Sequence, residues 1–261
     1  MRRHNSNDLV YYTFDSLRDC GALVHAISTR RGGVSPAPFD TLNLSRHVGD
    51  DAANVATNLK RLHTALALDA TMTVEASQAQ ADRVAVVDAR QRGTCIADVD
   101  ALVTNAPSVP LLLRYADCVP IFFFDPIHRA IGVAHAGWRG TIMHIAAKAA
   151  QTIFDKFGTR PRDLIACLAP SIGPCCYRVG EDVIAQIRAA FDNTDDLLIA
   201  QPGGGIHFDL WQANAQQLRA LGVAQIEIAQ ICTAHHTDEF YSWRAEREKT
   251  GRFGAIIAIT N

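Results

Sequence analysis

Cys118 and His135 are the two residues whose types and spacing most clearly indicate chemistry. They lie 17 residues apart in the segment Arg114–Thr141, RYADCVPIFFFDPIHRAIGVAHAGWRGT. A Cys beside a His can act as a nucleophile with its base. Alternatively, both can bind zinc and leave a position open for water or substrate. A structural role is the competing interpretation, because free Cys is among the most buried residue types. The polar neighbours Asp117 and Arg139, set among Gly-rich turns, support a functional role about as strongly as a structural one.

Two apolar segments are expected to bring this pair together. Val119–Phe124 and Ala130–His135 have the Val, Ile and Phe content of strands, and Asp125-Pro126 is typical of the turn between them. Antiparallel pairing places Cys118, before the first strand, beside His135 at the end of the second. A helix is expected to begin after Gly137 and Gly140, and its N-terminus would stabilise a thiolate or a bound anion.

Several arginines are candidates for binding an anionic group. Arg30 and Arg31 precede Gly32-Gly33 in a polar segment, where backbone N–H groups and basic side chains can hold an anion. The alternative is an Arg-Gly-Gly turn with solvated arginines. Asn43 of the same segment is a further substrate-binding candidate, as is Arg139. Arg244 is expected on a short strand with Tyr241, Ser242 and Trp243, where it can bind a phosphate or carboxylate or pair with a nearby glutamate.

Short strands dominate the rest of the chain, with fewer helices between them. The expected strands are Val10–Phe14, Leu23–Ser28, Arg83–Asp88, Pro110–Tyr115, Val119–Phe124, Ala130–His135, Leu164–Leu168 and Phe253–Ile259. The expected helices run from Asp50 or Asp51 to about Leu68, and over Thr141–Phe157, Glu181–Phe191 and Asp209–Leu221. This order lacks the regular alternation of a doubly wound sheet. It predicts one α+β domain over residues 1–261, with two packed sheets and helices outside.

Composition excludes several classes of protein. The chain has 261 residues and a net charge of -2, which argues against a nucleic-acid partner. The seven cysteines are odd in number and form no CxxC pair, so they are interpreted as reduced thiols rather than a disulfide framework. The basic start MRRHNSNDLVYYTF lacks the apolar core of a secretory signal, and the apolar runs are too short to span a membrane. We therefore expect a soluble cytoplasmic protein.

Eight motifs along the chain resemble those of the YfiH family, in the same order. They are TRRGGVS, LNLSRHVGDD, DVDALVTN, ADCVPI, AHAGWRGT, PSIGPCCYRVG, CT and YSWRAEREKTGR. The match covers about Ser28 to Ile257, and ADCVP followed by AHAGWRG is specific as a pair. Members of this family are described as laccase-domain or polyphenol-oxidase-like proteins and as purine nucleoside phosphorylases.

The resemblance implies a layered α/β/β/α fold, similar to the catalytic domain of cytotoxic necrotizing factor toxins. It also implies a zinc and nucleoside site made by a His of a Gln-Val-His-Gly motif, the Cys of ADCVP and the His of AHAGWRG. The last two correspond to Cys118 and His135, whereas the first falls on Gln80. A Gln amide oxygen is a weaker zinc ligand than imidazole. We therefore expect impaired zinc binding or use of the pair without metal.

The leading hypothesis from the resemblance is a purine nucleoside phosphorylase acting on adenosine, inosine and methylthioadenosine, with adenosine deaminase activity. The partners would be a purine nucleoside and phosphate. A metal-independent cysteine hydrolase that edits peptidoglycan precursors is the second hypothesis. A copper polyphenol oxidase is less favoured, because multicopper sites use several imidazoles and this chain has no His-x-His pair. An inactive nucleoside-binding protein is the fourth.

Overall fold

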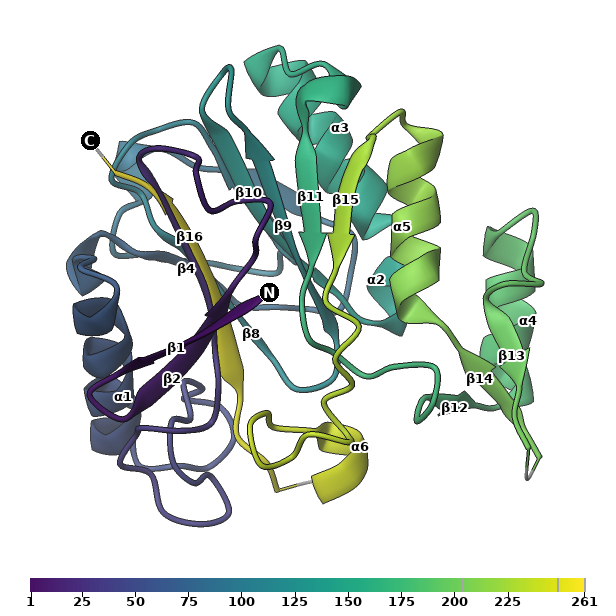
Figure 1. The fold of residues 1–261 in the computed structure, drawn as a ribbon, viewed down its shortest axis with the longest axis horizontal. Coiled ribbons are helices and arrows are strands. Elements are labelled where there is room, and N and C mark those ends of the chain that lie inside the picture. Colours follow the sequence, from purple (N-terminus) through teal and green to yellow (C-terminus); the bar gives the residue numbers. More distant parts are fainter. Residues whose placement is uncertain (203, 248, 261) are drawn as a thin grey trace.

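The computed structural model describes residues 1–202, 204–247 and 249–260. Within these ranges most strands form two sheets (Figure 1). The first has seven strands in the order β1-β2-β3-β16-β8-β4-β6. Their bounds are Arg2–Ser6 (β1), Leu9–Thr13 (β2), Leu23–Ser28 (β3), Phe253–Ile259 (β16), Leu111–Tyr115 (β8), Val74–Ala76 (β4) and Cys95–Ile96 (β6).

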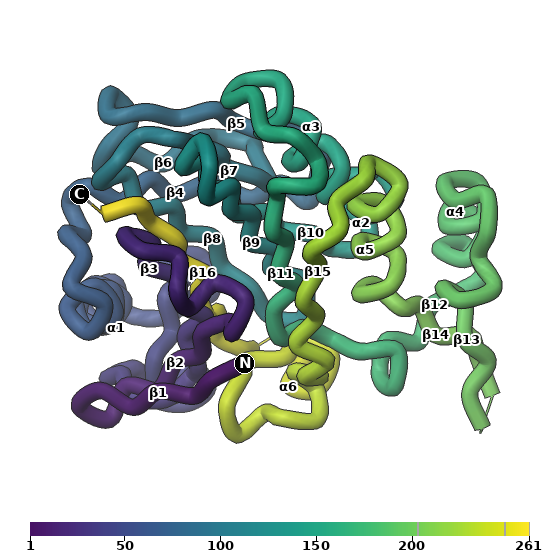
Figure 2. The backbone as a smooth tube through the Cα atoms, turned by 45° about the horizontal axis from the view of Figure 1, so that its top comes forward, coloured from purple at the N-terminus to yellow at the C-terminus, as the bar shows by residue number. Residues whose placement is uncertain are grey.

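A second sheet of six described strands has the order β15-β11-β9-β10-β7-β5 (Figure 2). Its strands are Gln225–Ile228 (β15), Ile165–Leu168 (β11), Val119–Asp125 (β9), Ala130–Ala136 (β10), Ala101–Thr104 (β7) and Val84–Val86 (β5). The smaller sheet β12-β14-β13 lies beside α4 at one side of the molecule (Figure 1). It consists of Arg178–Val179 (β12), Ile206–Phe208 (β14) and Leu198–Ala200 (β13).

Three of the helices, α1, α3 and α5, cover the outer faces of the two large sheets. The helices of the described residues are Ala52–Ala65 (α1), Trp138–Ile142 (α2), Ile145–Phe157 (α3), Glu181–Ala190 (α4), Leu210–Ala220 (α5) and Trp243–Glu246 (α6), with 3-10 turns at Ala70–Met72, Ala89–Gln91 and Pro161–Asp163. The α1 helix packs on the first sheet, while α3 and α5 lie against the second. The layers are therefore helix, sheet, sheet and helix, which confirms the predicted layered α+β fold.

Successive side chains of the central strands point to opposite faces of their sheet, and together they fill three apolar layers. Phe122 and Phe124 of β9 point into the layer between the sheets, whereas Ile121 and Phe123 of the same strand face α3 and α5. On β16, Ile256 faces α1. Because each of these strands is covered on both faces, its sequence is a continuous apolar run rather than an alternating one.

One helix prediction and one strand prediction are wrong. The expected helix Thr141–Phe157 is two helices, because His144 adopts a left-handed conformation (φ 62°) between α2 and α3. The expected strand Tyr241–Arg244 is a helix start, where Ser242 accepts a hydrogen bond from the backbone N–H of Ala245 and caps α6. The other predicted helices begin within a residue of their observed starts.

Candidate functional site

The β9–β10 hairpin places Cys118 beside His135. In its antiparallel register His135 is opposite Pro120 and Ala136 is opposite Val119, so the expected pairing is confirmed. Cys118 and Gly137 lie just beyond the paired ends. A Cβ atom on Gly137 would be 3.0 Å from Cys118 Sγ and 3.9 Å from His135 Cε1. A glycine therefore allows the thiol and the imidazole to approach the same point.

Asp100 orients the imidazole of His135. Its buried Oδ1 atom lies 2.7 Å from His135 Nδ1, and its backbone carbonyl accepts from His135 N at 2.7 Å. Burial raises the pKa of the Asp100 carboxyl, but the bonds from His135 and the neighbouring backbone outweigh it and leave the pKa below its usual value. The ionised carboxylate accepts the proton of Nδ1, so Nε2 is the ring nitrogen available for chemistry or metal binding.

The pKa of His135 is raised by its partners. Burial alone lowers it, but Cys118 and the Asp100 carboxylate more than compensate and raise the pKa to about 9. The raised value favours the imidazolium form at neutral pH.

The loop at Gln80 is held by the same carboxylate. Asp100 accepts hydrogen bonds from the backbone N–H groups of Ala79, Gln80 and Ala81 at 3.1, 3.1 and 2.8 Å. Residue 80 is thereby fixed next to His135 through its backbone, with φ at 55°. Its side-chain Oε1 lies 3.4 Å from Nη1 of Arg139.

This donor set fits zinc at only two of three positions. Cys118 Sγ and His135 Nε2 are good zinc ligands, whereas Gln80 supplies a neutral amide oxygen. The Arg139 guanidinium beside that oxygen also disfavours a cation there. The side chains that the structure places here therefore do not make a complete zinc site of the expected kind.

Asp117 ties three segments together next to Cys118. The buried carboxylate accepts from Thr233 Oγ1 at 2.7 Å and from the backbone N–H of Arg244 at 2.6 Å, and its carbonyl accepts from Ile172 N at 2.8 Å. Its φ is 83°, a conformation that turns the chain sharply before Cys118. Burial raises the pKa of Asp117. These bonds hold the segments that follow β11 and β15 against the hairpin.

Three arginines lie around the pair. Arg139 stacks on Trp138 with 4.4 Å between guanidinium and ring centre, and Arg244 stacks on Tyr177 at 5.1 Å. Arg244 Nη1 also donates to the carbonyl of Arg178 at 3.1 Å rather than to a glutamate. Burial lowers the pKa of Arg252, and the adjacent Cys118 opposes that shift. Exposed Arg139 and Arg244 retain N–H groups that can bind an anion.

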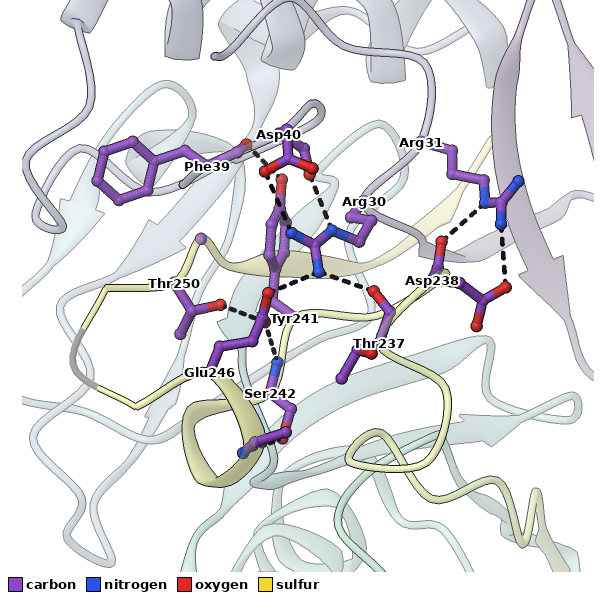
Figure 3. Close-up of polar contacts among 12 residues, drawn as sticks. Arg30, Arg31, Phe39, Asp40, Thr237, Asp238, Tyr241, Ser242, Glu246 and Thr250 are labelled. Atoms are coloured by element: carbon purple, nitrogen blue, oxygen red, sulfur yellow. Dashed lines mark hydrogen bonds and ion pairs between the residues drawn. The ribbon is translucent and has the colours of Figure 1, made fainter. Parts of the chain in front are cut away.

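Arg30 and Arg31 line a surface hollow of about 470 Å³ whose lining residues do not include Cys118 or His135. Figure 3 shows the polar contacts of these two arginines. Nearly buried Arg30 donates to the carbonyls of Asp40 and Thr237 at 2.8 and 2.7 Å and pairs with Glu246 at 2.7 Å. Glu246 in turn accepts from the backbone N–H of Ser242 at 2.9 Å. Arg30 thus fixes the loop that carries Arg244.

The remaining candidates of this segment are also bonded within the protein. Arg31 pairs with Asp238 at 3.0 Å (Figure 3). Asn43 is fully buried, and its side chain bonds to Ser45, Asp50 and the backbone N–H of Arg252. Asn43 thus holds the backbone of Arg252 through its side-chain oxygen. Substrate binding by Arg30, Arg31 and Asn43 stays a prediction.

Asp100 was not singled out by sequence reasoning, although it stands at the start of a short apolar strand, in DVDALVTN. A carboxylate that precedes a buried strand was the available signal. The position of partly buried Arg252 near Cys118 had no such signal, since it depends on pairing between strands distant in sequence.

The comparisons with known proteins agree over nearly the whole chain. The family model described as "Multi-copper polyphenol oxidoreductase laccase" matches residues 24–260. A solved structure of the hypothetical protein YfiH from Bacillus licheniformis has a TM-score of 0.91 and 32% identity, covering 99% of both chains. This chain belongs to the YfiH family.

Two of its relatives have names that state an enzymatic activity. A protein named purine nucleoside phosphorylase from Bacteroides thetaiotaomicron is 34% identical over 256 residues, 94% of this chain and 95% of that protein. A protein named adenosine deaminase RL5, from an unknown prokaryotic organism, is 35% identical over 240 residues, 88% of this chain and 91% of that protein.

No helix in the described part of the chain is long and apolar enough to cross a membrane.

Proposed function

We propose that this protein is a purine nucleoside phosphorylase that acts at Cys118 and His135. The observation that carries the proposal is the buried Asp100–His135 pair, which presents Nε2 beside Cys118 with exposed arginines nearby. The name of the Bacteroides relative supports the reaction class. The substrates would be adenosine, inosine or methylthioadenosine, together with phosphate.

Phosphorolysis makes three demands on such a site. The bond from the ribose C1′ to the purine nitrogen breaks, a phosphate oxygen bonds to C1′, and the departing purine takes up a proton. His135 can supply that proton, since its raised pKa keeps it charged at neutral pH. Arg139 and Arg244 bear the free N–H donors that suit phosphate.

A phosphate-dependent product tests this reaction. The purified chain is incubated with adenosine, with and without phosphate, and ribose 1-phosphate, ribose, adenine and inosine are measured. We expect ribose 1-phosphate and adenine only when phosphate is present, and their loss in His135→Ala. Cys95→Ala serves as the control, because Cys95 is exposed and lies on the edge strand β6 of the other large sheet. Absence of both products from the wild-type chain, with or without added zinc, would contradict the proposal.

The deaminase activity should be the weaker one in this chain. Deamination needs an activated water, which zinc bound to Cys118 and His135 would supply. Gln80 provides a poor third ligand, so inosine formation is expected to be slow.

Replacing Gln80 by His should restore the third zinc ligand. Asp100 already holds the backbone of residue 80, so the new imidazole would start from a position next to His135. We expect Gln80→His to hold about one more zinc ion per chain than the wild type in elemental analysis. Addition of Cys118→Ser should remove that extra zinc. Equal zinc content in Gln80→His and wild type would show that residue 80 is not the third ligand.

A metal-independent cysteine hydrolase is the second candidate. Cys118, His135 and Asp100 supply the thiol, the imidazole that can hold the thiol proton and the orienting carboxylate of a nucleophilic site. A thiol-reactive analogue of an acylated peptidoglycan precursor should then label Cys118, as mass spectrometry of the digested protein can show. Full hydrolase activity in Cys118→Ala would exclude this mechanism.

A further inference from the structure

A second group of metal-binding side chains lies in two turns next to the hairpin. One turn follows β11 and contains Cys175 and Cys176; the other follows β15 and contains Cys232 and His235. Ser171 N donates to the carbonyl of Ile231 at 3.1 Å and Thr233 N donates to the carbonyl of Ser171 at 3.1 Å. This parallel bridge holds the two turns side by side.

The four donor atoms already lie close together. The three Sγ atoms and a ring nitrogen of His235 are all within 4.8 Å of one another. Two separations are shorter, with 3.7 Å from Cys175 Sγ to His235 Nδ1 and 3.1 Å from Cys176 Sγ to His235 Nε2. Tetrahedral zinc with Zn–S of about 2.3 Å and Zn–N of about 2.0 Å places its ligand atoms roughly 3.5–3.8 Å apart. Side-chain adjustments of about 1 Å therefore close the set around one ion.

The backbone supports this arrangement. Cys232 and His235 have the C-x-x-H spacing of a tight turn, in which the N–H groups of His235 and His236 donate to the carbonyl of Cys232. The N–H of Gly173 donates to Cys232 Sγ at 3.3 Å, a bond that stabilises a thiolate as outer-shell donors do in metal sites. A Cβ on Gly173 would come within 3.3 Å of Cys175 Sγ, so the turn closes tightly on the cysteines.

Zinc binds cysteine in its thiolate form, so loading this set of ligands would release the thiol protons to solvent.

We propose that Cys175, Cys176, Cys232 and His235 form a structural zinc site separate from Cys118. Three thiolates and one imidazole complete a tetrahedral shell, with no position left for substrate. The ion would join the two turns that hold Asp117 through Ile172 and Thr233. Zinc here therefore stabilises the segments that pack beside Cys118 through Asp117. This inference does not depend on the proposed function.

Zinc retention in a reducing buffer tests the site. The full chain is loaded with zinc, dialysed against a chelator and measured by elemental analysis. We expect about one zinc ion per chain in wild type, Cys118→Ser and Cys95→Ser. Cys175→Ser and His235→Ala should weaken zinc binding by more than the ~10–100-fold that loss of an outer-shell partner causes. Both side chains are exposed, so circular dichroism should show an unchanged fold.

Cobalt provides a second, spectroscopic readout of the same site. Co²⁺ bound to the wild-type chain should give the visible bands of a tetrahedral site and a thiolate-to-metal band with the intensity of three thiolates. Cys118→Ser should leave that spectrum unchanged. A band with the intensity of one thiolate would overturn the proposal. So would zinc retention that is absent from wild type or unaffected in the Cys175→Ser/His235→Ala double variant.

Discussion

At the scale of single residues, one carboxylate organises the candidate site. Asp100 binds His135 through Nδ1 and three consecutive backbone N–H groups of the Gln80 loop. A buried charge is stable only when such bonds replace its hydration. The same bonds fix the proton on Nδ1 and direct Nε2 to Cys118.

Asp100→Asn should therefore impair the site more than the fold. An amide can accept through its oxygen, but its NH₂ group faces N–H donors that it cannot satisfy. We expect kcat/KM for phosphorolysis to fall by roughly 10²-fold or more, as loss of an orienting carboxylate does elsewhere.

Asp82→Asn is the matched control for this experiment. Asp82 is close in sequence to the same loop but pairs with exposed Lys148. Its replacement should leave kcat/KM within about twofold, because exposed ion pairs contribute little. Equal losses in Asp82→Asn and Asp100→Asn would refute an orienting role for Asp100.

At the scale of secondary structure, local pattern predicted the elements that carry Cys118 and His135. β3 and β16 match their expected bounds, and β9 and β10 extend one residue further than expected. These strands are apolar runs between turn residues, and the hairpin needs only local contacts. Predicting that Cys118 and His135 meet required no more than that.

Several short strands were missed because they depend on partners distant in sequence. β4, β6 and β12 have two or three residues each, too short for a pattern, and exist because such a strand pairs with them. His144 separates α2 from α3 by its left-handed backbone conformation, which its residue type does not predict. Asp100 and Thr233 reach the site through contacts with residues distant in sequence. Sequence spacing therefore did not indicate their roles.

Gly137→Ala tests the close approach at the hairpin ends. Gly137 has φ of −72° and ψ of 173°, which alanine adopts without strain, so the fold should persist. The new methyl group would lie 3.0 Å from Cys118 Sγ and displace it. We expect a drop of about tenfold or more in kcat/KM, with a melting temperature close to that of wild type. A fully active Gly137→Ala chain would show that Cys118 does not need its observed position.

At the scale of the whole molecule, the layer between the two sheets contains a buried histidine. His25 of β3 accepts from Phe14 N at 2.8 Å, and its ring meets Phe122 of the opposite sheet edge-on at 6.0 Å. Burial lowers the pKa of His25 to about 4, with Glu227 opposing and His4 adding to the shift. Protonation of His25 is therefore coupled to the packing of the two sheets.

Stability should fall in acid because of this residue. As pH drops below 6.5 the unfolded chain binds a proton at His25, while the folded chain resists until about pH 4. The contribution is present above pH 6.5 and lost between these values, amounting to about 2 kcal/mol at pH 5 relative to pH 7.

His25→Gln isolates this contribution. Glutamine retains a hydrogen-bond acceptor but does not titrate, so its free energy of unfolding should depend less on pH, although it starts lower. The free energy of unfolding of wild type and of His25→Gln is measured with urea at pH 7 and pH 5. Comparing the change with pH between the two proteins cancels the contribution of other groups such as His63. Parallel pH curves for the two proteins would disprove the assignment.

The attachment of the Gln80 loop to Asp100 also bears on which substitutions this loop tolerates. The loop is anchored through main-chain N–H groups, which every residue type other than proline provides. The side chain at position 80 can therefore be exchanged while the backbone around it keeps its place. The scaffold and the chemistry of that side chain are in this way separable, so that one can change without the other.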